Sequence, residues 1–277
     1  MNCRHALVPV IVVSLAALAG CGGGKSSMPA ASTAPVATGP SAAAPTAAAP
    51  TGTSAGGGGD YLGVLANAKA KAQEQEAANN LKQFALAFHN FHDTFGHFPT
   101  QAGDPQVPSK LSWRVEILDF IEESALRQQF KRDEPWDSPH NKKVLDTMPM
   151  PKLYRDPRFQ PKDEKTNLTY FQGIAGDGGI LSEKGGATLT AITNANGTSQ
   201  TLMIVEAGSP VPWTKPDDYV HDLKKPLPPL GGPNPREFFL AAFADGHVQR
   251  IPMKTDEKTL RCMMQWHNAT PFVLPKP

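Results

Sequence analysis

Cysteine is scarce in this sequence of 277 residues, which contains three: Cys3, Cys21 and Cys262. This scarcity excludes the disulfide-rich class of small secreted domains, in which several bridges compensate for a small hydrophobic core. A region of about 200 residues can bury a sufficient core without covalent cross-links. We therefore expect a fold that is stabilised by packing alone.

The sequence also lacks an excess of either charge, because 27 Lys and Arg residues oppose 26 Asp and Glu residues. A general nucleic-acid-binding protein carries a basic excess on one face, so nucleic acid is not an expected partner. Long hydrophobic runs are lacking as well. The most apolar run, residues 6–18, is shorter than the ~20 residues that span a bilayer.

Residues 1–20 have the pattern of a bacterial export signal. Arg4 and His5 precede the apolar run, which contains no acidic residue. The run ends in Leu18-Ala19-Gly20-Cys21, which matches the lipobox of bacterial lipoproteins. We expect Cys21 to be the lipid attachment site. The alternative is an ordinary cleaved signal that a Cys follows by chance.

A lipoprotein signal peptide would make the membrane an anchor for this chain. Acyl chains such as palmitate contribute about 0.8 kcal/mol per buried CH₂ group, so several chains hold a protein at a membrane surface without a spanning helix. Residue 22 is Gly and not the Asp that retains many lipoproteins in the inner membrane. We expect an exported protein at the periplasmic face of the outer membrane.

Residues 21–59 are almost entirely Ala, Pro, Thr, Ser and Gly after the Cys, with Lys25 as their one charged residue. Such a composition cannot build a core and is typical of a disordered tether. A random coil of this length has a mean reach of roughly 35 Å. The folded domain is then expected to cover residues 60–277.

The first half of this domain has a helical pattern. Apolar residues recur with helical spacing up to Phe91, which predicts a helix from Asp60 to about Asp93. Ser112 is a candidate N-cap of a second helix, and Ser138-Pro139 of a third.

The second half has a β pattern. Strands are expected at residues 168–174, 201–206, 238–244 and 247–251, and a helix capped by Asp256 is expected at residues 257–266. Asp245-Gly246 lies between the last two strands and predicts a hairpin with a type I′ turn. The order of elements predicts an α+β fold in which the N-terminal helix packs on an antiparallel sheet.

Three histidines, His89, His92 and His97, lie close together in sequence beside Asp93. Two His residues one helical turn apart can share a metal ion. The spacing of three differs from the four-residue spacing of helical zinc proteases, and no Glu lies in the base position. Because phenylalanines alternate with these histidines, aromatic packing at the end of the helix is the favoured interpretation, and no metal or other cofactor is expected.

Other candidates for chemistry are weaker still. Asp217 and Asp218 are paired carboxylates near Trp213, but adjacent side chains usually diverge, so a solvated loop is favoured over glycosidase chemistry. Residues 176–179 lack the further residues of a phosphate or calcium loop. Cys262 is expected to be a buried thiol, and Ser199 and Ser209 lack a nucleophile elbow.

Several segments together resemble a known family, the planctomycete domain of unknown function fifteen-fifty-nine. The segments that carry the resemblance are Asn79-Asn80-Leu81-Lys82-Gln83, residues 88–99 with His89, His92 and Asp93, Leu111-Ser112-Trp113-Arg114-Val115, residues 133–141 with Trp136, residues 211–218 with Trp213, and Phe243-Ala244-Asp245-Gly246-His247-Val248. The family is similar to type IV pilins and type II secretion pseudopilins. The resemblance therefore implies a pilin-like fold, leaving the biochemical role unassigned.

The chain departs from the family pattern in three places. A lipobox and tether stand where relatives have a prepilin cleavage site and a long apolar helix. Ala78 and Asp156 stand where the family pattern has two cysteines, whose joint absence is expected if they form a disulfide in relatives. Pro235 replaces a family His, which weakens any site built on that position.

These observations favour a membrane-anchored lipoprotein that presents a non-catalytic, pseudopilin-like domain for contacts with envelope proteins. We expect a monomer or weak dimer, attached to the bilayer through acylated Cys21. The alternative from another class is an envelope hydrolase or metal-dependent enzyme that uses the His89/His92 region or Asp217/Asp218. A small-ligand-binding lipoprotein is a third possibility.

Overall fold

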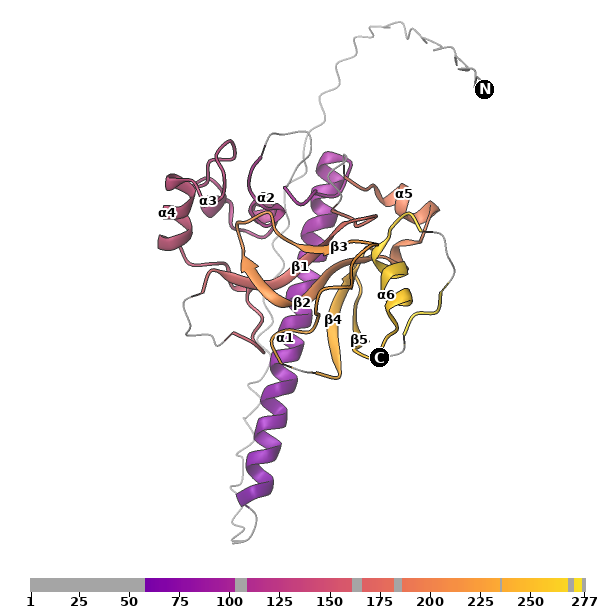
Figure 1. The fold of residues 1–277 in the computed structure, drawn as a ribbon. Coiled ribbons are helices and arrows are strands. Elements are labelled where there is room, and N and C mark those ends of the chain that lie inside the picture. Colours follow the sequence, from indigo (N-terminus) through magenta and orange to yellow (C-terminus); the bar gives the residue numbers. More distant parts are fainter. Residues whose placement is uncertain are drawn as a thin grey trace, which may run out of the picture. The chain divides into compact units, whose positions relative to one another are not determined.

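The computed structural model describes residues 58–102, 109–160, 166–181, 186–234, 236–268 and 272–275. The predicted signal peptide, Cys21, nearly all of the predicted tether and Pro235 lie outside these residues. The described residues form an α+β fold, in which a long helix packs on a five-stranded sheet (Figure 1). None of the helices in these ranges has the length and apolarity that a bilayer-spanning helix needs.

Helix α1 spans Gly58–Phe95 and is the longest element. Its first part extends beyond the sheet (Figure 1), and residues 62–72 are exposed around the whole circumference of the helix. Further along, Leu81, Phe84 and Phe88 are completely buried against the sheet and its neighbours. The apolar stripe that the sequence predicted is therefore the packing face of α1.

Short helices and 3-10 turns follow α1. They are α2 (Trp113–Glu116), η1 (Ile117–Phe120), α3 (Ser124–Arg127), α4 (Pro139–Thr147) and η2 (Lys152–Tyr154). The Ser112 hydroxyl accepts a hydrogen bond from the Arg114 amide, and the Ser138 hydroxyl accepts one from the Asn141 amide. Both predicted N-caps are confirmed, because each hydroxyl satisfies an amide that has no partner within its helix.

The sheet has the strand order β3-β1-β2-β4-β5. Its strands are β1 (Leu168–Gly176), β2 (Leu202–Pro212), β3 (Tyr219–His221), β4 (Phe238–Phe243) and β5 (Val248–Pro252). The pairs β1–β2, β2–β4 and β4–β5 are antiparallel. Strand β3 instead pairs parallel with the end of β1. The sheet is thus mixed, and the expectation of a purely antiparallel sheet is wrong at this edge strand.

Two apolar clusters cover the two faces of the sheet. The α1 side contains Phe84, Trp113 and Phe171. The other side contains Val205 and Ile251, packed against α6 (Glu257–Met264). Helix α5 (Leu189–Asn194) and η3 (Thr198–Gln200) connect β1 to β2.

The β4–β5 connection differs from the predicted type I′ turn. Gly246 has φ of +91°, but Asp245 does not share this positive φ, which a type I′ turn requires at both central positions. Instead, the Gly246 amide donates to the Phe243 carbonyl at 2.9 Å, and the Phe243 amide donates to the His247 carbonyl at 2.9 Å. The hairpin is confirmed and its turn type is corrected, because the tight turn begins one residue earlier.

Candidate functional site

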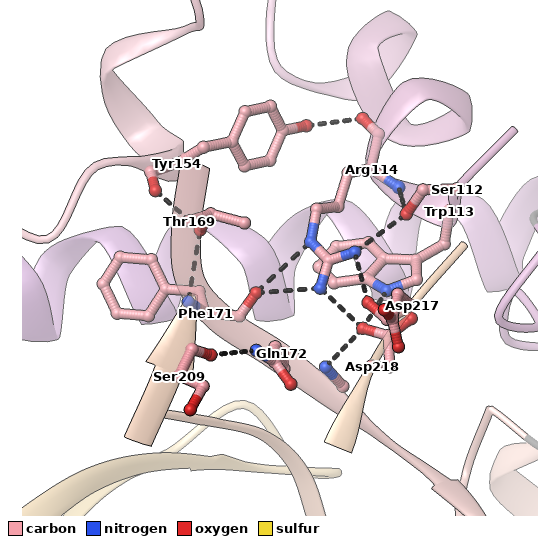
Figure 2. A network of polar contacts seen from close by, with 11 residues as sticks. Ser112, Trp113, Arg114, Tyr154, Thr169, Phe171, Gln172, Ser209, Asp217 and Asp218 are labelled. Atoms are coloured by element: carbon pink, nitrogen blue, oxygen red, sulfur yellow. Dashed lines mark hydrogen bonds and ion pairs between the residues drawn. The ribbon is translucent and has the colours of Figure 1, made fainter. Parts of the chain in front are cut away.

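Arg114, at the start of α2, is completely buried and lies at the centre of a polar network (Figure 2). Its Nε and Nη2 groups donate to the Phe171 carbonyl at 3.2 and 3.0 Å. Nη1 donates to the Ser112 hydroxyl at 2.9 Å and to the Asp217 carbonyl at 3.3 Å. The planar guanidinium thus joins three separate segments of the chain in a fixed geometry.

Asp218 is the counter-ion of this guanidinium. Its Oδ1 atom accepts from Arg114 Nη2 at 2.6 Å, from the Trp113 indole at 3.0 Å and from the Gly173 amide at 2.9 Å. Burial raises the pKa of the Asp218 carboxyl to about 6, against the opposing effects of Arg114 and these hydrogen bonds. Three donors on one oxygen orient the carboxylate, so Asp218 fixes the Trp113 ring and the edge of β1 together.

The network continues through Tyr154. The Tyr154 hydroxyl donates to the Arg114 carbonyl at 2.6 Å, and the Thr169 hydroxyl donates to the Tyr154 carbonyl at 2.7 Å. The Tyr154 ring stacks on Phe84 of α1 and on Trp213, with centroid distances of 5.2 and 5.4 Å. These contacts connect α1, η2 and the sheet, so the Arg114 network holds these elements of the domain together.

The structure separates the two carboxylates that the sequence paired. Asp217 is half-exposed and forms an ion pair with Lys215 at 2.7 Å, whereas Asp218 has no exposed side-chain surface. A glycosidase needs two carboxyl groups that face one substrate bond from either side. The expected divergence of the adjacent side chains is observed, but the expected solvation of Asp218 is wrong because Arg114 draws it into the core.

The three histidines lie at the C-terminal end of α1 and in the turn that follows. His92 Nε2 accepts a hydrogen bond from the Leu189 amide at 3.2 Å and so contacts the first turn of α5. His97 Nδ1 lies 3.0 Å from the Phe98 carbonyl oxygen. The rings of His89 and His92 pack on Phe98, with centroid distances of 5.6 and 5.2 Å. These contacts support the packing interpretation for the histidine cluster.

His89 lies next to the β4–β5 turn. A Cβ atom on Gly246 would be 3.9 Å from His89 Nε2, so the turn closes over the imidazole. On the turn itself, His247 Nδ1 lies 2.6 Å from Asp245 Oδ1, and its ring stacks on Phe243 at 4.2 Å. His89 therefore lies close to Gly246 in the fold, while His92 is engaged with α5.

The remaining residues that the sequence singled out have structural surroundings. Asn80 donates to the Arg155 carbonyl at 3.0 Å, and Asn79 Oδ1 accepts from Gln75 on the exposed side of α1. Trp136 packs, partly buried, against the main core. Cys262 is buried with a free thiol, as expected. The Asp93 side chain is 78% exposed.

A second buried ion group was not predicted. Arg158 pairs with Asp156 at 2.7 Å and with Glu206, and both carboxylate side chains have no exposed surface. The other oxygen of Glu206 accepts from the Leu240 amide at 2.8 Å. The spacing Asp156-Pro-Arg158 was the available sequence signal, since side chains two residues apart can meet in a turn. At a position where the family resemblance implies a cysteine in relatives, Asp156 therefore forms an ion pair.

Two adjoining hollows lie beside the segment between α4 and η2. One has a volume of about 500 Å³ and the other about 410 Å³, and both are lined by Pro149, Met150 and Lys152. The larger hollow is also lined by the apolar residues Ile121, Leu126 and Met148. These hollows contain none of the histidines or paired aspartates that the sequence singled out.

The placement and burial of these side chains limit the chemistry that they can support. Across the described ranges, no group of three or more His, Cys, Asp or Glu side chains is placed to hold a metal ion. Arg114 and Asp218 carry opposite charges at the ideal distance for an ion pair, yet no substrate can reach them because both are buried. The Arg114 network is therefore best described as a buried structural centre that joins α2, η2, β1 and the segment before β3.

Comparison with known proteins finds a family model that part of the chain matches. Residues 67–188 match the family model described as protein of unknown function (DUF1559). The matched region begins in α1, includes α2 with Trp113 and Arg114 as well as β1, and ends directly before α5. No curated protein and no solved structure gives a match.

Proposed function

We propose that this chain, which matches the DUF1559 family model over residues 67–188, is an exported lipoprotein that presents a non-catalytic, pseudopilin-like domain at the cell envelope. In this proposal Cys21 carries the lipid, residues 22–57 act as the tether, and the α+β domain, which begins with α1 at Gly58, makes contacts with other envelope proteins. The membrane provides attachment and is not a substrate.

The non-catalytic part of the proposal is supported by the burial of the charged side chains in the Arg114 network. Arg114 and Asp218 are both completely buried, and Arg114 forms its bonds with other parts of the same chain. A catalytic acid, base or nucleophile must reach a substrate within hydrogen-bond distance. Groups that are enclosed by protein on every side position the backbone instead.

The protein-contact part is supported by exposed apolar surface on α1. Leu62 is 68% exposed, Val64 59% and Leu65 47%. Large exposed apolar side chains that gather on one element are typical of protein–protein contact sites. This surface can bind another protein through apolar contacts, and the tether would allow it to reach its partners.

The anchoring part can be tested by metabolic labelling with a fatty-acid analogue in a bacterial host that processes lipoproteins. Cys21→Ser should abolish labelling, because it removes the thiol that accepts the diacylglycerol. Cys262→Ser is the matched control, since it removes a buried thiol and should leave labelling unchanged. Labelling that persists in Cys21→Ser, or that is lost in Cys262→Ser alone, would refute the assignment.

A further inference from the structure

The first turns of α1 are exposed to solvent, whereas the tertiary contacts of the helix begin at Gln73 and Glu74. Residues 62–72 are exposed on every side, and the first completely buried side chain of the helix is Ala77. Most helices in proteins are stabilised by burying one apolar face. These eleven exposed residues form about three helical turns and include the apolar Leu62, Val64 and Leu65, so their apolar side chains have no buried face in the described part of the chain.

The exposed side of α1 carries a heptad pattern. Leu65, Ala68, Ala72, Gln75 and Asn79 follow one another at spacings of three, four, three and four, and all five are exposed. In heptad notation they occupy a, d, a, d and a, which form the seam between two helices of a coiled coil. We call these five residues the α1 seam.

The α1 seam lies on the opposite side of the helix from the sheet. Ala77, Phe84 and Phe91 occupy f positions of the same heptads and are at most 1% exposed. The f position points away from the seam, so the domain itself leaves the seam accessible along its length. A second α1 helix can approach there without displacing the sheet.

Charges beside the α1 seam match a parallel copy of the same helix. Lys71 occupies a g position and Glu76 the following e position, and both are exposed. In a parallel pair, a g residue of one helix meets the e residue of the next heptad on the other, which brings Lys71 next to Glu76 twice by symmetry. Asn79 at an a position favours the same register, because its amide pairs with its symmetry mate.

We propose that the α1 seam pairs two copies of this chain as a parallel, two-helix contact. The proposal rests on the proposed lipid anchor, since two chains attached through Cys21 to one membrane are both tethered at the N-terminal end of α1, which is compatible with a parallel pair. The seam contains one Leu and two Ala residues, so the contact is weak in solution. Confinement to a membrane raises the effective concentration and drives the pairing.

Disulfide trapping tests this arrangement on the acylated full-length chain in lipid vesicles. Leu65→Cys places a thiol at an a position, where symmetry mates of a parallel pair come within the 4.4–6.8 Å Cα separation that a disulfide needs. Asn67→Cys is the matched control, because position 67 is equally exposed but points away from the seam. The expected result is a disulfide-linked dimer for Leu65→Cys and a monomer for Asn67→Cys.

A charge reversal provides the second measurement. Combined with Leu65→Cys, Lys71→Glu should lower the cross-linked fraction by about fivefold, as expected when two exposed ion pairs become repulsive, while Lys71→Arg should retain it. Equal cross-linking at positions 65 and 67 would overturn the proposal. Stronger cross-linking between Leu65→Cys chains and Lys82→Cys chains than between two Leu65→Cys chains would also overturn the proposal, because it indicates antiparallel pairing. Absent fatty-acid labelling at Cys21 refutes the anchor, whereas a labelled chain that fails to cross-link refutes the pairing alone.

Discussion

At the scale of single residues, the fold depends on a buried cation and its one carboxylate partner. Arg114 and Asp218 are 104 positions apart in sequence and meet at 2.6 Å with no exposed surface on either side chain. Transfer of both charges from water is unfavourable, and their attraction offsets this cost only while every donor stays bonded. The pair therefore makes the domain sensitive to loss of either member.

We expect Arg114→Met to destabilise the domain by about 3–5 kcal/mol, because it leaves the Asp218 carboxylate buried without its cation. Lys215→Met is the matched control, since Lys215 forms a half-exposed pair with Asp217. That change should cost less than about 1 kcal/mol. Chemical denaturation of both variants gives the comparison, and equal losses would contradict a central role for Arg114.

The Asp218 carboxyl should titrate with a midpoint of about 6, because burial raises its pKa from 3.8. A folded-state pKa above the unfolded value means that the folded protein binds more protons between those two values. This group therefore contributes stability that is fully present below about pH 4 and is lost as the pH rises through 6. The carboxyl carbon of Asp218, followed by NMR between pH 3 and 8, measures the midpoint directly. A midpoint below 4 would show that Arg114 outweighs burial.

At the scale of elements, the start and end of α1 and the caps of the short helices could be predicted from local sequence. The predicted helix from Asp60 to Asp93 is observed as Gly58–Phe95, and Asp256 caps α6 by accepting from the Thr259 amide. Periodicity and capping are local properties, so a single sequence contains them.

Strand β3 could not be predicted because it is three residues long and depends on a distant partner. Tyr219, Val220 and His221 pair with residues 174–176 at the end of β1. The buried ion groups escaped prediction for the same reason, since Arg158 meets Glu206 across the fold. The sequence did identify the segment around Trp113 and the segment before Tyr219, but it did not predict the contact that joins them.

Gly176 tests the junction of β1 and β3. It has φ of +86°, and a Cβ atom there would lie 2.3 Å from the His221 carbonyl oxygen. Gly176→Ala should therefore destabilise the domain by about 2 kcal/mol or more, through both backbone strain and the clash. Gly197→Ala is the control, since Gly197 has φ of +85° but open space around it. The difference between their unfolding free energies isolates the clash, and equal values would show that β3 can shift.

At the scale of the whole molecule, packing and internal ion pairs account for the domain without a covalent cross-link. Helix α1 is joined to the segment before β1 by hydrogen bonds from Gln73 to the Pro157 carbonyl and from Asn80 to the Arg155 carbonyl. Asp156, between these carbonyls, is buried against Arg158. These contacts hold together the two segments where the family resemblance implies a disulfide in relatives.

Thermal unfolding of the protein should be unaffected by reductant and by EDTA, because the buried Cys262 thiol is free and the histidines are engaged in packing. Circular dichroism with and without each reagent measures the midpoint. A fall of more than about 4 °C with EDTA corresponds to at least roughly 1 kcal/mol in a domain of this size. Such a fall would indicate a bound metal ion and favour the enzyme alternative.

The central claim is that a lipid on Cys21 attaches this domain to the envelope. Intact-mass spectrometry of the protein purified from host membranes tests it most directly, because it determines both the first residue and its modification. The expected result is a mature chain that begins at Cys21 and carries the mass of its acyl groups. A chain that begins at another residue, or an unmodified Cys21 in the membrane fraction, would contradict it.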